Sequence, residues 1–328
     1  MKSREFGRSG VNVSEVGLGC WQLDGVCWGD VTDDAAFEIL AASLDQGVTF
    51  FDTADVYGSG RSEELIGRFL KTRPEDVFVA TKIGRFPVAE GETNFSEEMF
   101  RKHTEASLRR LGVESLDLTQ LHCIPTEQLR RGDVFDWLRG LRKAGKIRRF
   151  GASVESMDEA LWCLEQDGLA SLQIIFNIFR QKPIDVLFDT ARAKGVALIV
   201  RLPLASGLLS GKMARDTTFP ENDHRTFNRD GQLFNVGETF AGIPFEKGVE
   251  LADMLKHLAP RGMTMAQMAL RWILDHNAVS VVIPGASRAE QARGNAGVSD
   301  LPPLPDELHA ELRRFYQREV ADHIRGPY

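Results

Sequence analysis

Short apolar runs alternate with amphipathic runs along most of this chain. Eight apolar runs are rich in Val, Ile, Leu and Phe and lack strict polar alternation, which is typical of strands buried on both faces of a parallel sheet. They cover residues 16–20, 48–52, 77–82, 117–121, 148–152, 171–176, 196–201 and 279–283. Amphipathic runs predict helices at 34–46, 63–70, 97–111, 127–144, 157–167, 184–194, 246–257, 264–275 and 288–296. Eight such β/α units predict an α/β fold, a (β/α)8 TIM barrel.

The two ends of the chain and one long segment depart from this alternation. Residues 4–7 and 11–14 flank a Ser-Gly turn and predict an N-terminal β-hairpin, and a C-terminal tail helix is expected near 305–319. Residues 214–246 are polar and show little periodicity, and a loop of this length in a compact barrel is functional or disordered. Because no repeat or interdomain linker appears, we expect one domain over residues 1–328.

An open doubly wound sheet is the competing architecture. Its dinucleotide-binding fingerprint needs three glycines after the first strand. The segment 17–22 reads GLGCWQ and lacks the third glycine. Lys212 follows Ser210 and Gly211, but Met213 stands where a phosphate-binding loop needs Ser or Thr. The motifs therefore favour the barrel.

Composition excludes several classes of protein. A formal net charge of -7 argues against a general nucleic-acid binder or an anionic-membrane binder. No apolar run approaches the roughly 18–20 residues of a membrane helix, and residues 1–10 contain no apolar signal region, so we expect a cytoplasmic protein. The seven histidines are scattered and the four cysteines form no CxxC pair, which predicts no metal site. Cys123 follows His122, but neighbours on a strand point to opposite faces.

Proton-transfer residues gather where three neighbouring strands end. Asp52 and Lys82 close the second and third apolar runs, His122 directly follows the fourth, and Tyr57 follows Asp52 by five positions. Loops at the carboxyl ends of barrel strands carry function, so these side chains are expected to converge. A lysine ammonium favours the phenolate and lowers a tyrosine pKa from about 10. The set therefore predicts protonation of a carbonyl oxygen, with the hydride supplied by a nicotinamide cofactor.

These residues lie in segments that resemble the aldo-keto reductase family over nearly the whole chain. The similar segments occur in the family's order and spacing. They are VGLGCWQ (16–22), FFDTADVYGSGRSEELIG (50–67), ATKIG (80–84), LDLTQLH (116–122), GAS (151–153), PLASGLLSGK (203–212), AQMALRWIL (266–274) and VIPGASRAEQARGN (282–295).

The resemblance implies a role for each matching residue. Tyr57 is the general acid, Lys82 lowers its pKa, Asp52 pairs with Lys82, and His122 orients the substrate oxygen. The other residues at the family's cofactor positions are expected to bind the cofactor: Trp21, Ser153, Gln173, Arg201, Leu204, Ser206, Lys212, Gly285, Ser287, Arg288, Gln291 and Asn295. Among these, Ser153 and Gln173 match carboxamide-binding positions, and Trp21 matches an aromatic wall.

The segment around Arg288 favours NADPH over NADH. It opens a predicted helix, whose free backbone amides attract anions, and the guanidinium adds a charge-assisted contact for a ribose 2′-phosphate. The alternative that Arg288 is only a surface charge stays open. The chain also departs from the family pattern at four positions: Cys20 for Thr, Val154 for Asn, Arg201 for a stacking Tyr or Trp, and Gly294 for an acidic residue.

The resemblance leaves three functions open. The first is NADPH-dependent reduction of an aldehyde or ketone to an alcohol. The second is oxidation of a sugar or polyol by the same residues, and the third is a cofactor-binding regulator similar to potassium-channel β subunits. We expect a small-molecule carbonyl substrate and no obligate protein partner. Loops 21–32, 84–95, 123–127 and 214–246 are expected to select the substrate.

Overall fold

Eight parallel strands form the centre of the molecule. The computed structural model describes residues 1–90 and 92–328. The strands are β3 (Leu18–Gly19), β4 (Phe50–Asp52), β5 (Phe78–Ile83), β6 (Leu118–His122), β7 (Phe150–Ser153), β8 (Leu169–Ile175), β9 (Ala197–Arg201) and β10 (Val279–Val282). They pair in chain order from β3 to β10. Parallel bridges from Val16 to Val282 and from Gly19 to Gly285 join the first and last strands, which closes the sheet into the predicted barrel.

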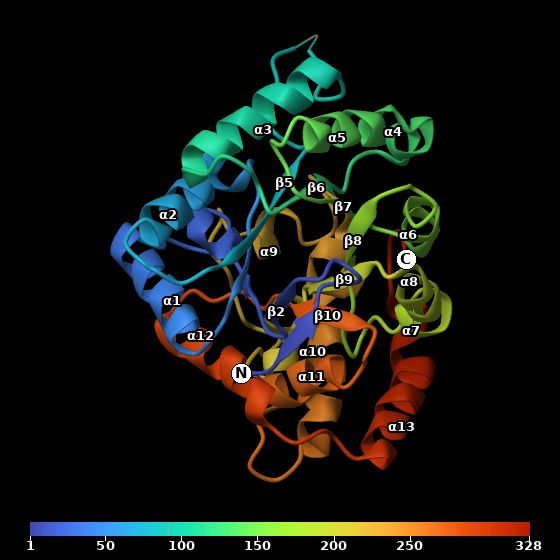
Figure 1. The fold of residues 1–328 in the computed structure, drawn as a ribbon. Coiled ribbons are helices and arrows are strands. Elements are labelled where there is room, and N and C mark those ends of the chain that lie inside the picture. Colours follow the sequence, from blue (N-terminus) through green and yellow to red (C-terminus); the bar gives the residue numbers. More distant parts are fainter. Residues whose placement is uncertain (91) are drawn as a thin grey trace.

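Most of the helices surround the strands (Figure 1). The helices of the described residues are α1 (Asp33–Asp45), α2 (Arg61–Leu70), α3 (Glu97–Leu111), α4 (Thr126–Arg131), α5 (Asp133–Lys143), α6 (Met157–Cys163), α7 (Lys182–Val186), α8 (Phe188–Lys194), α9 (His224–Phe227), α10 (Phe245–Leu255), α11 (Met265–Leu274), α12 (Ala289–Ala296) and α13 (Asp306–Phe315). Local sequence fixes several ends. The hydroxyl of Ser96 accepts the Met99 N–H at the start of α3, and the left-handed Gly112 ends the helix.

Two predicted helices are each divided into two. The run 127–144 forms α4 and α5, separated by Gly132, whose φ of 84° is outside the helical region. The run 184–194 forms α7 and α8, which meet at Leu187, where φ is −116°. Amphipathic periodicity continues across both breaks, so the hydrophobic pattern alone does not reveal them.

A separate apolar cluster lies inside the barrel, and the predicted hairpin contributes to it. The hairpin strands are β1 (Ser3–Glu5) and β2 (Asn12–Ser14), paired antiparallel. Phe6 follows β1, is 0% exposed, and packs against the rings of Phe50 and Phe78 at centroid distances of 5.8 and 5.1 Å. Because Phe50 and Phe78 begin β4 and β5, the hairpin covers the amino-terminal end of the barrel.

The long polar segment 214–246 is ordered and contains the short helix α9. The Asn228 side chain organises its turns by accepting the backbone N–H groups of Leu233 and Phe234, both at 2.9 Å. The C-terminal tail packs on this segment, where the Arg325 N–H donates to Gly242 O at 3.1 Å. Within residues 1–90 and 92–328, no helix has the length and apolar character needed to cross a membrane.

Candidate active site

The strand ends bring the four predicted acid/base residues into one place. Asp52 and His122 are the last residues of β4 and β6, and Lys82 is the second-last residue of β5. Tyr57 begins the short turn that follows β4. Asp52, Lys82 and His122 are all buried, so their polar groups interact in a region of low dielectric constant.

Lys82 is the central member of this group. Its ammonium contacts the carboxylate of Asp52 and donates to Thr53 O at 2.8 Å. The same nitrogen lies 3.4 Å from the Tyr57 hydroxyl. Lys82 is 1% exposed, and the Asp52 carboxylate supplies the counter-charge that a buried ammonium requires.

Two glutamine side chains fix the other oxygen of Asp52. Gln173 Nε2 donates to Asp52 Oδ2 at 2.7 Å, and Gln120 Nε2 approaches the same oxygen at 3.3 Å. Gln120 is two residues before His122 on β6, so both side chains point into the barrel. Sequence reasoning missed Gln120 because nothing distinguishes it from any polar residue in an apolar strand.

The pKa of Tyr57 shifts in the direction opposite to the expected one. Burial raises the pKa of the phenol well above its usual range, and the nearby carboxylates of Asp52 and Glu238 add to the effect. The expected lowering by Lys82 does not dominate, because Asp52 neutralises the ammonium and burial penalises the phenolate. In this structure Tyr57 therefore remains a protonated donor at neutral pH.

His122 lies across the ring of Tyr57. The two ring centroids are 5.6 Å apart and the ring planes are nearly perpendicular, at 85°. Burial, followed by the charges of Arg85, Lys82 and Arg201, lowers the pKa of His122 well below its usual range. His122 is therefore a neutral imidazole, able to donate a hydrogen bond from one nitrogen without carrying charge.

A cavity of about 350 Å³ connects this group to the loops after β9 and β10. Fourteen of the sixteen predicted site residues line it: Trp21, Asp52, Tyr57, His122, Ser153, Gln173, Arg201, Leu204, Ser206, Lys212, Gly285, Ser287, Arg288 and Gln291. Lys82 lies behind Tyr57. Asn295 is outside the lining, and its side chain donates to Gly285 O at 3.2 Å, so it supports the cavity wall.

The lining of the cavity offers groups that suit a nicotinamide dinucleotide. The loop after β9 holds Leu202, Ala205 and Ser206 at φ values of 52°, 48° and 56°. Backbone conformations of this kind are costly for side chains larger than glycine and occur mainly at binding sites. Lys212 and Arg288 provide positive charge in the same cavity as the polar groups of Ser153 and Gln173. The lining therefore offers positive charge for phosphates and polar side chains for a carboxamide.

Two of the expected cofactor residues also have structural partners. The Ser206 hydroxyl accepts the Phe240 N–H at 3.1 Å and donates to Glu238 O at 3.4 Å, which ties the β9 loop to the segment 214–246. The Ser287 N–H and hydroxyl both donate to Gln291 Oε1, at 2.8 and 3.0 Å. The side-chain oxygen of Gln291 is therefore engaged at the start of α12.

The prediction that Cys123 and His122 point to opposite faces is wrong. Cys123 lies just beyond the end of β6 with a φ of 45°, so strand alternation no longer applies, and both residues line the cavity. Cys123 Sγ, Glu155 and Glu238 also bring three potential metal-ligand atoms within 4.8 Å of one another. Arg85 and Arg201 lie against these groups, and their positive charges disfavour a bound cation.

The cavity has further lining residues outside the segments that resemble the family. Trp28, Arg225 and Glu238 come from two of the four loops, 21–32 and 214–246, that were expected to select the substrate. Arg225 lies over the rings of Phe219 and Trp28, 4.2 and 5.0 Å from their centroids. Loop 84–95 contributes Arg85 to the charged cluster beside the cavity, and its residue 91 lies outside the described residues.

Comparison with known proteins agrees with this geometry. The Aldo/keto reductase family model matches residues 15–317. The chain is 29% identical to Aldo-keto reductase YhdN of Bacillus subtilis (strain 168), and the aligned region covers 100% of this chain and 97% of that protein. The structure of the glycerol dehydrogenase AKR11B4 from Gluconobacter oxydans has 32% sequence identity and a TM-score of 0.78, covering 99% and 98% of the two chains.

Other relatives differ in the cofactor that their names state. The NADH-specific methylglyoxal reductase of Escherichia coli (strain K12) is 27% identical over 92% of this chain and 94% of its own. Aldo-keto reductase yakc [NADP(+)] of Schizosaccharomyces pombe is 29% identical over 92% of this chain and 88% of its own. Both names state a nicotinamide cofactor, but they differ in its form. The protein is an oxidoreductase that acts on carbonyl or alcohol groups, and it belongs to the aldo/keto reductase family.

Proposed function

We propose that this protein reduces the carbonyl group of a small aldehyde or ketone to an alcohol, with NADPH as the hydride donor. The contact at 3.4 Å between Lys82 Nζ and the hydroxyl of Tyr57, a residue that lines the cavity, carries the proposal. It brings a proton donor and a positive charge to the place where an alkoxide would form. We further propose that residues 1–328 act as one domain in the cytoplasm without an obligate protein partner.

Tyr57 is the general acid in this proposal. Burial keeps the phenol protonated, and a nascent alkoxide is a stronger base than a phenolate, so donation remains favourable. The Lys82 ammonium stabilises the phenolate that is left, and Asp52 keeps that ammonium in place. The neutral His122 donates a hydrogen bond to the substrate oxygen, which orients the carbonyl group.

The cavity residues would hold the cofactor, which supplies the hydride that no side chain provides. Ser153 and Gln173 would bind the carboxamide, and Lys212 would bind the pyrophosphate. The other lining residues are Trp21, Arg201, Leu204, Ser206, Gly285, Ser287 and Gln291, with Asn295 supporting Gly285. Arg288 precedes α12 and is exposed at the cavity, which suits a 2′-phosphate, so we favour NADPH over NADH.

Oxidation of a polyol is the second candidate. The similarity to the structure of a glycerol dehydrogenase, at 32% identity, favours it. In that direction Tyr57 must accept a proton as a phenolate. The raised pKa of Tyr57 makes the phenolate scarce at neutral pH, so the same site favours reduction.

The test is NADPH oxidation by the purified protein over a panel of aldehydes, ketones, aldoses and steroids, repeated with NADH. Oxidation of polyols with NADP+ is measured in parallel. We expect turnover of at least one carbonyl class, with a higher kcat/KM for NADPH than for NADH. Bound NADPH without turnover of any carbonyl would instead support a regulatory role. Turnover confined to polyol oxidation would favour the second candidate.

A further inference from the structure

The cavity contains one carboxylate that the acid/base group does not use. Glu238 lies in the segment 214–246 and lines the same cavity as Tyr57 and His122. Its side chain is 9% exposed. Burial acts to raise the pKa of Glu238, but the guanidinium groups of Arg201 and Arg85 outweigh burial and lower it. Glu238 is therefore an ionised hydrogen-bond acceptor beside the reacting groups.

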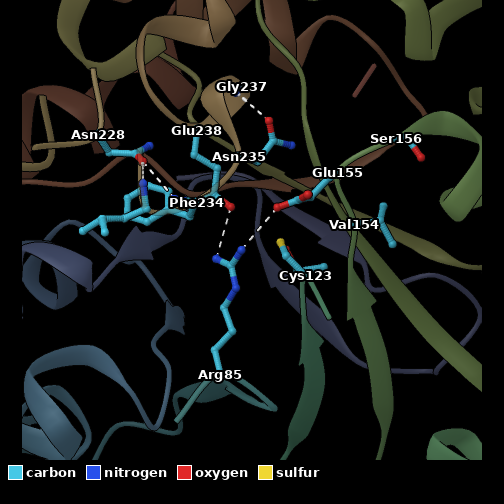
Figure 2. Close-up of polar contacts among 12 residues, drawn as sticks. Arg85, Cys123, Val154, Glu155, Ser156, Asn228, Phe234, Asn235, Gly237 and Glu238 are labelled. Carbon is cyan, nitrogen blue, oxygen red and sulfur yellow. Dashed lines mark hydrogen bonds and ion pairs between the residues drawn. The ribbon is translucent and has the colours of Figure 1, made fainter. Parts of the chain in front are cut away.

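In the part of the chain that the structure describes, one oxygen of Glu238 is engaged and the other is not. Oε1 lies 3.3 Å from an Arg85 nitrogen and 3.9 Å from an Arg201 nitrogen. Figure 2 shows Arg85 pointing between Glu238 and Glu155 and contacting both. Within residues 1–90 and 92–328, no donor makes a hydrogen bond to Oε2, and this oxygen is not sealed from solvent. Oε2 is therefore available to a molecule in the cavity.

The backbone around Glu238 is held in place from several sides. The Ser206 hydroxyl bonds Glu238 O and the Phe240 N–H, and Asn235 Oδ1 accepts the Gly237 N–H at 2.7 Å. Phe240 and the residue after it adopt φ values of 52° and 59°. Such strain persists only where surrounding contacts determine the conformation, and preorganised groups of this kind bind ligands selectively.

The charges around Glu238 restrict the net charge that a ligand bound there can carry. Arg85 and Arg201 face the two carboxylates Glu155 and Glu238, so the cluster has no formal excess of either sign. Arg201 also donates to Cys123 Sγ at 3.4 Å. The Glu238 carboxylate would repel an anionic substrate, and the Arg201 guanidinium would repel a cationic one. A neutral hydroxyl group satisfies Oε2 without disturbing this balance.

We propose that Glu238 is a specificity-determining residue, which accepts a hydrogen bond from a substrate hydroxyl group adjacent to the reacting carbonyl. The enzyme then prefers small hydroxylated carbonyl compounds to their deoxy and anionic analogues. This inference rests on the proposed function. It adds a substrate class and the residue that recognises this class.

Three ketones of nearly equal size test this preference: hydroxyacetone, butan-2-one and pyruvate. In the wild type, kcat/KM for hydroxyacetone is expected to exceed that for each of the other two by about 10-fold or more, as a charge-assisted hydrogen bond allows. Glu238→Leu removes the acceptor and brings the hydroxyacetone to butan-2-one ratio within about twofold of one. Glu238→Gln leaves the positive charges of Arg85 and Arg201 in excess. The kcat/KM for pyruvate should therefore increase relative to that for butan-2-one.

Glu221→Gln is the matched control, because Glu221 lies in the same segment, is exposed, and does not line the cavity. It should leave all three ratios unchanged. Wild-type ratios near one, or ratios that both Glu238 variants leave unaltered, overturn the inference. Thermal melting of each variant checks that the segment still folds.

A binding measurement separates this inference from the proposed function. Trp21 and Trp28 line the cavity, so tryptophan fluorescence reports ligands there. Propane-1,2-diol is expected to bind the wild type more tightly than butan-2-ol, and Glu238→Leu should abolish the difference. If no ketone is reduced but this pattern appears, the proposed function fails and the role of Glu238 stands. Equal affinities for the two alcohols overturn that role.

Discussion

The ammonium nitrogen of Lys82 lies 3.4 Å from the phenolic oxygen of Tyr57, and the Asp52 carboxylate holds it there. The pKa of Tyr57 is nevertheless raised, because burial and nearby carboxylates outweigh the neutralised cation. In the proposed reaction, the pair would keep a proton until an alkoxide forms. It is not arranged to release that proton into water.

Replacing Tyr57 by Phe should remove the proton donor and keep the aromatic ring beside His122. We expect kcat for carbonyl reduction to fall by about 10²–10⁴-fold, the range for a positioned general acid. NADPH affinity, measured by fluorescence, should change little. Tyr316→Phe is the control, since Tyr316 pairs with Tyr328 at 2.8 Å and does not line the cavity. Wild-type rates in Tyr57→Phe would remove its assigned role.

Replacing Arg288 by Gln should discriminate between the two nicotinamide cofactors. A guanidinium contact to a 2′-phosphate is charge-assisted, so its loss should raise the KM for NADPH about 10-fold and leave that for NADH nearly unchanged. Arg293→Gln is a matched control on α12, because Arg293 is exposed and does not line the cavity. Equal changes for the two cofactors would mean that Arg288 does not recognise the 2′-phosphate.

Replacing Arg201 by Tyr tests the charge beneath the proposed nicotinamide position. Arg201 is buried, and its guanidinium donates to the backbone oxygen of Val154 at 3.2 Å. Val154 directly follows Ser153 in the chain. Its positive charge should disfavour the positively charged oxidised ring. We expect Arg201→Tyr to tighten NADP+ relative to NADPH by about threefold or more. Arg201→Lys keeps the charge and should retain the wild-type ratio; an unchanged ratio in Arg201→Tyr removes this explanation.

The barrel and the positions of the acid/base residues could be predicted from the sequence because both depend on local pattern. Apolar runs mark buried strands, and Asp52, Lys82 and His122 occur where those runs end. The direction of the Tyr57 shift could not be predicted. It depends on how completely the phenol is buried and on Glu238, a residue 181 positions away in the chain.

The charged cluster at the cavity was also beyond sequence reasoning. Arg85, Glu155 and Glu238 come from three separate loops, and no spacing links them. Cys123 was assigned to the opposite face from His122 because the strand was assumed to continue, whereas a single left-handed residue changes its direction. Contacts of this kind arise from tertiary structure, and neither the periodicity nor the composition of the sequence predicts them.

Replacing Phe6 by Ala should show how far the hairpin stabilises the barrel. Phe6 is fully buried against both Phe50 and Phe78, so its removal leaves a cavity inside the closed sheet. We expect a loss of about 3–5 kcal/mol in the free energy of unfolding, measured with urea. Leu233→Ala is the control, because Leu233 is 72% exposed. A loss below about 1 kcal/mol would mean that the hairpin is a dispensable cover.

Asp55 should make the stability of the protein depend on pH. Burial, followed by the charge of Glu63, raises the pKa of Asp55 to about 8, although Arg110 and Lys82 oppose the shift. His103 Nδ1 lies 3.4 Å away, but burial and the charges of Lys102 and Arg110 lower the pKa of His103, so the contact is not an ion pair at neutral pH. Asp55 is therefore a protonated acid inside the folded protein.

The sign follows from proton uptake in the two states. An unfolded Asp titrates near pH 4, so between about pH 4 and 8 the folded state binds one proton more than the unfolded state. The contribution of Asp55 to stability is complete below pH 4 and is lost as the pH rises to about 8. Asp55→Asn does not titrate. Its stability relative to the wild type should increase by at least about 1.4 kcal/mol from pH 5 to pH 8 in urea unfolding. The exposed Asp322→Asn variant should show no such trend. If the difference in stability between Asp55→Asn and the wild type does not change with pH, the pKa of Asp55 in the folded protein is close to its unfolded value.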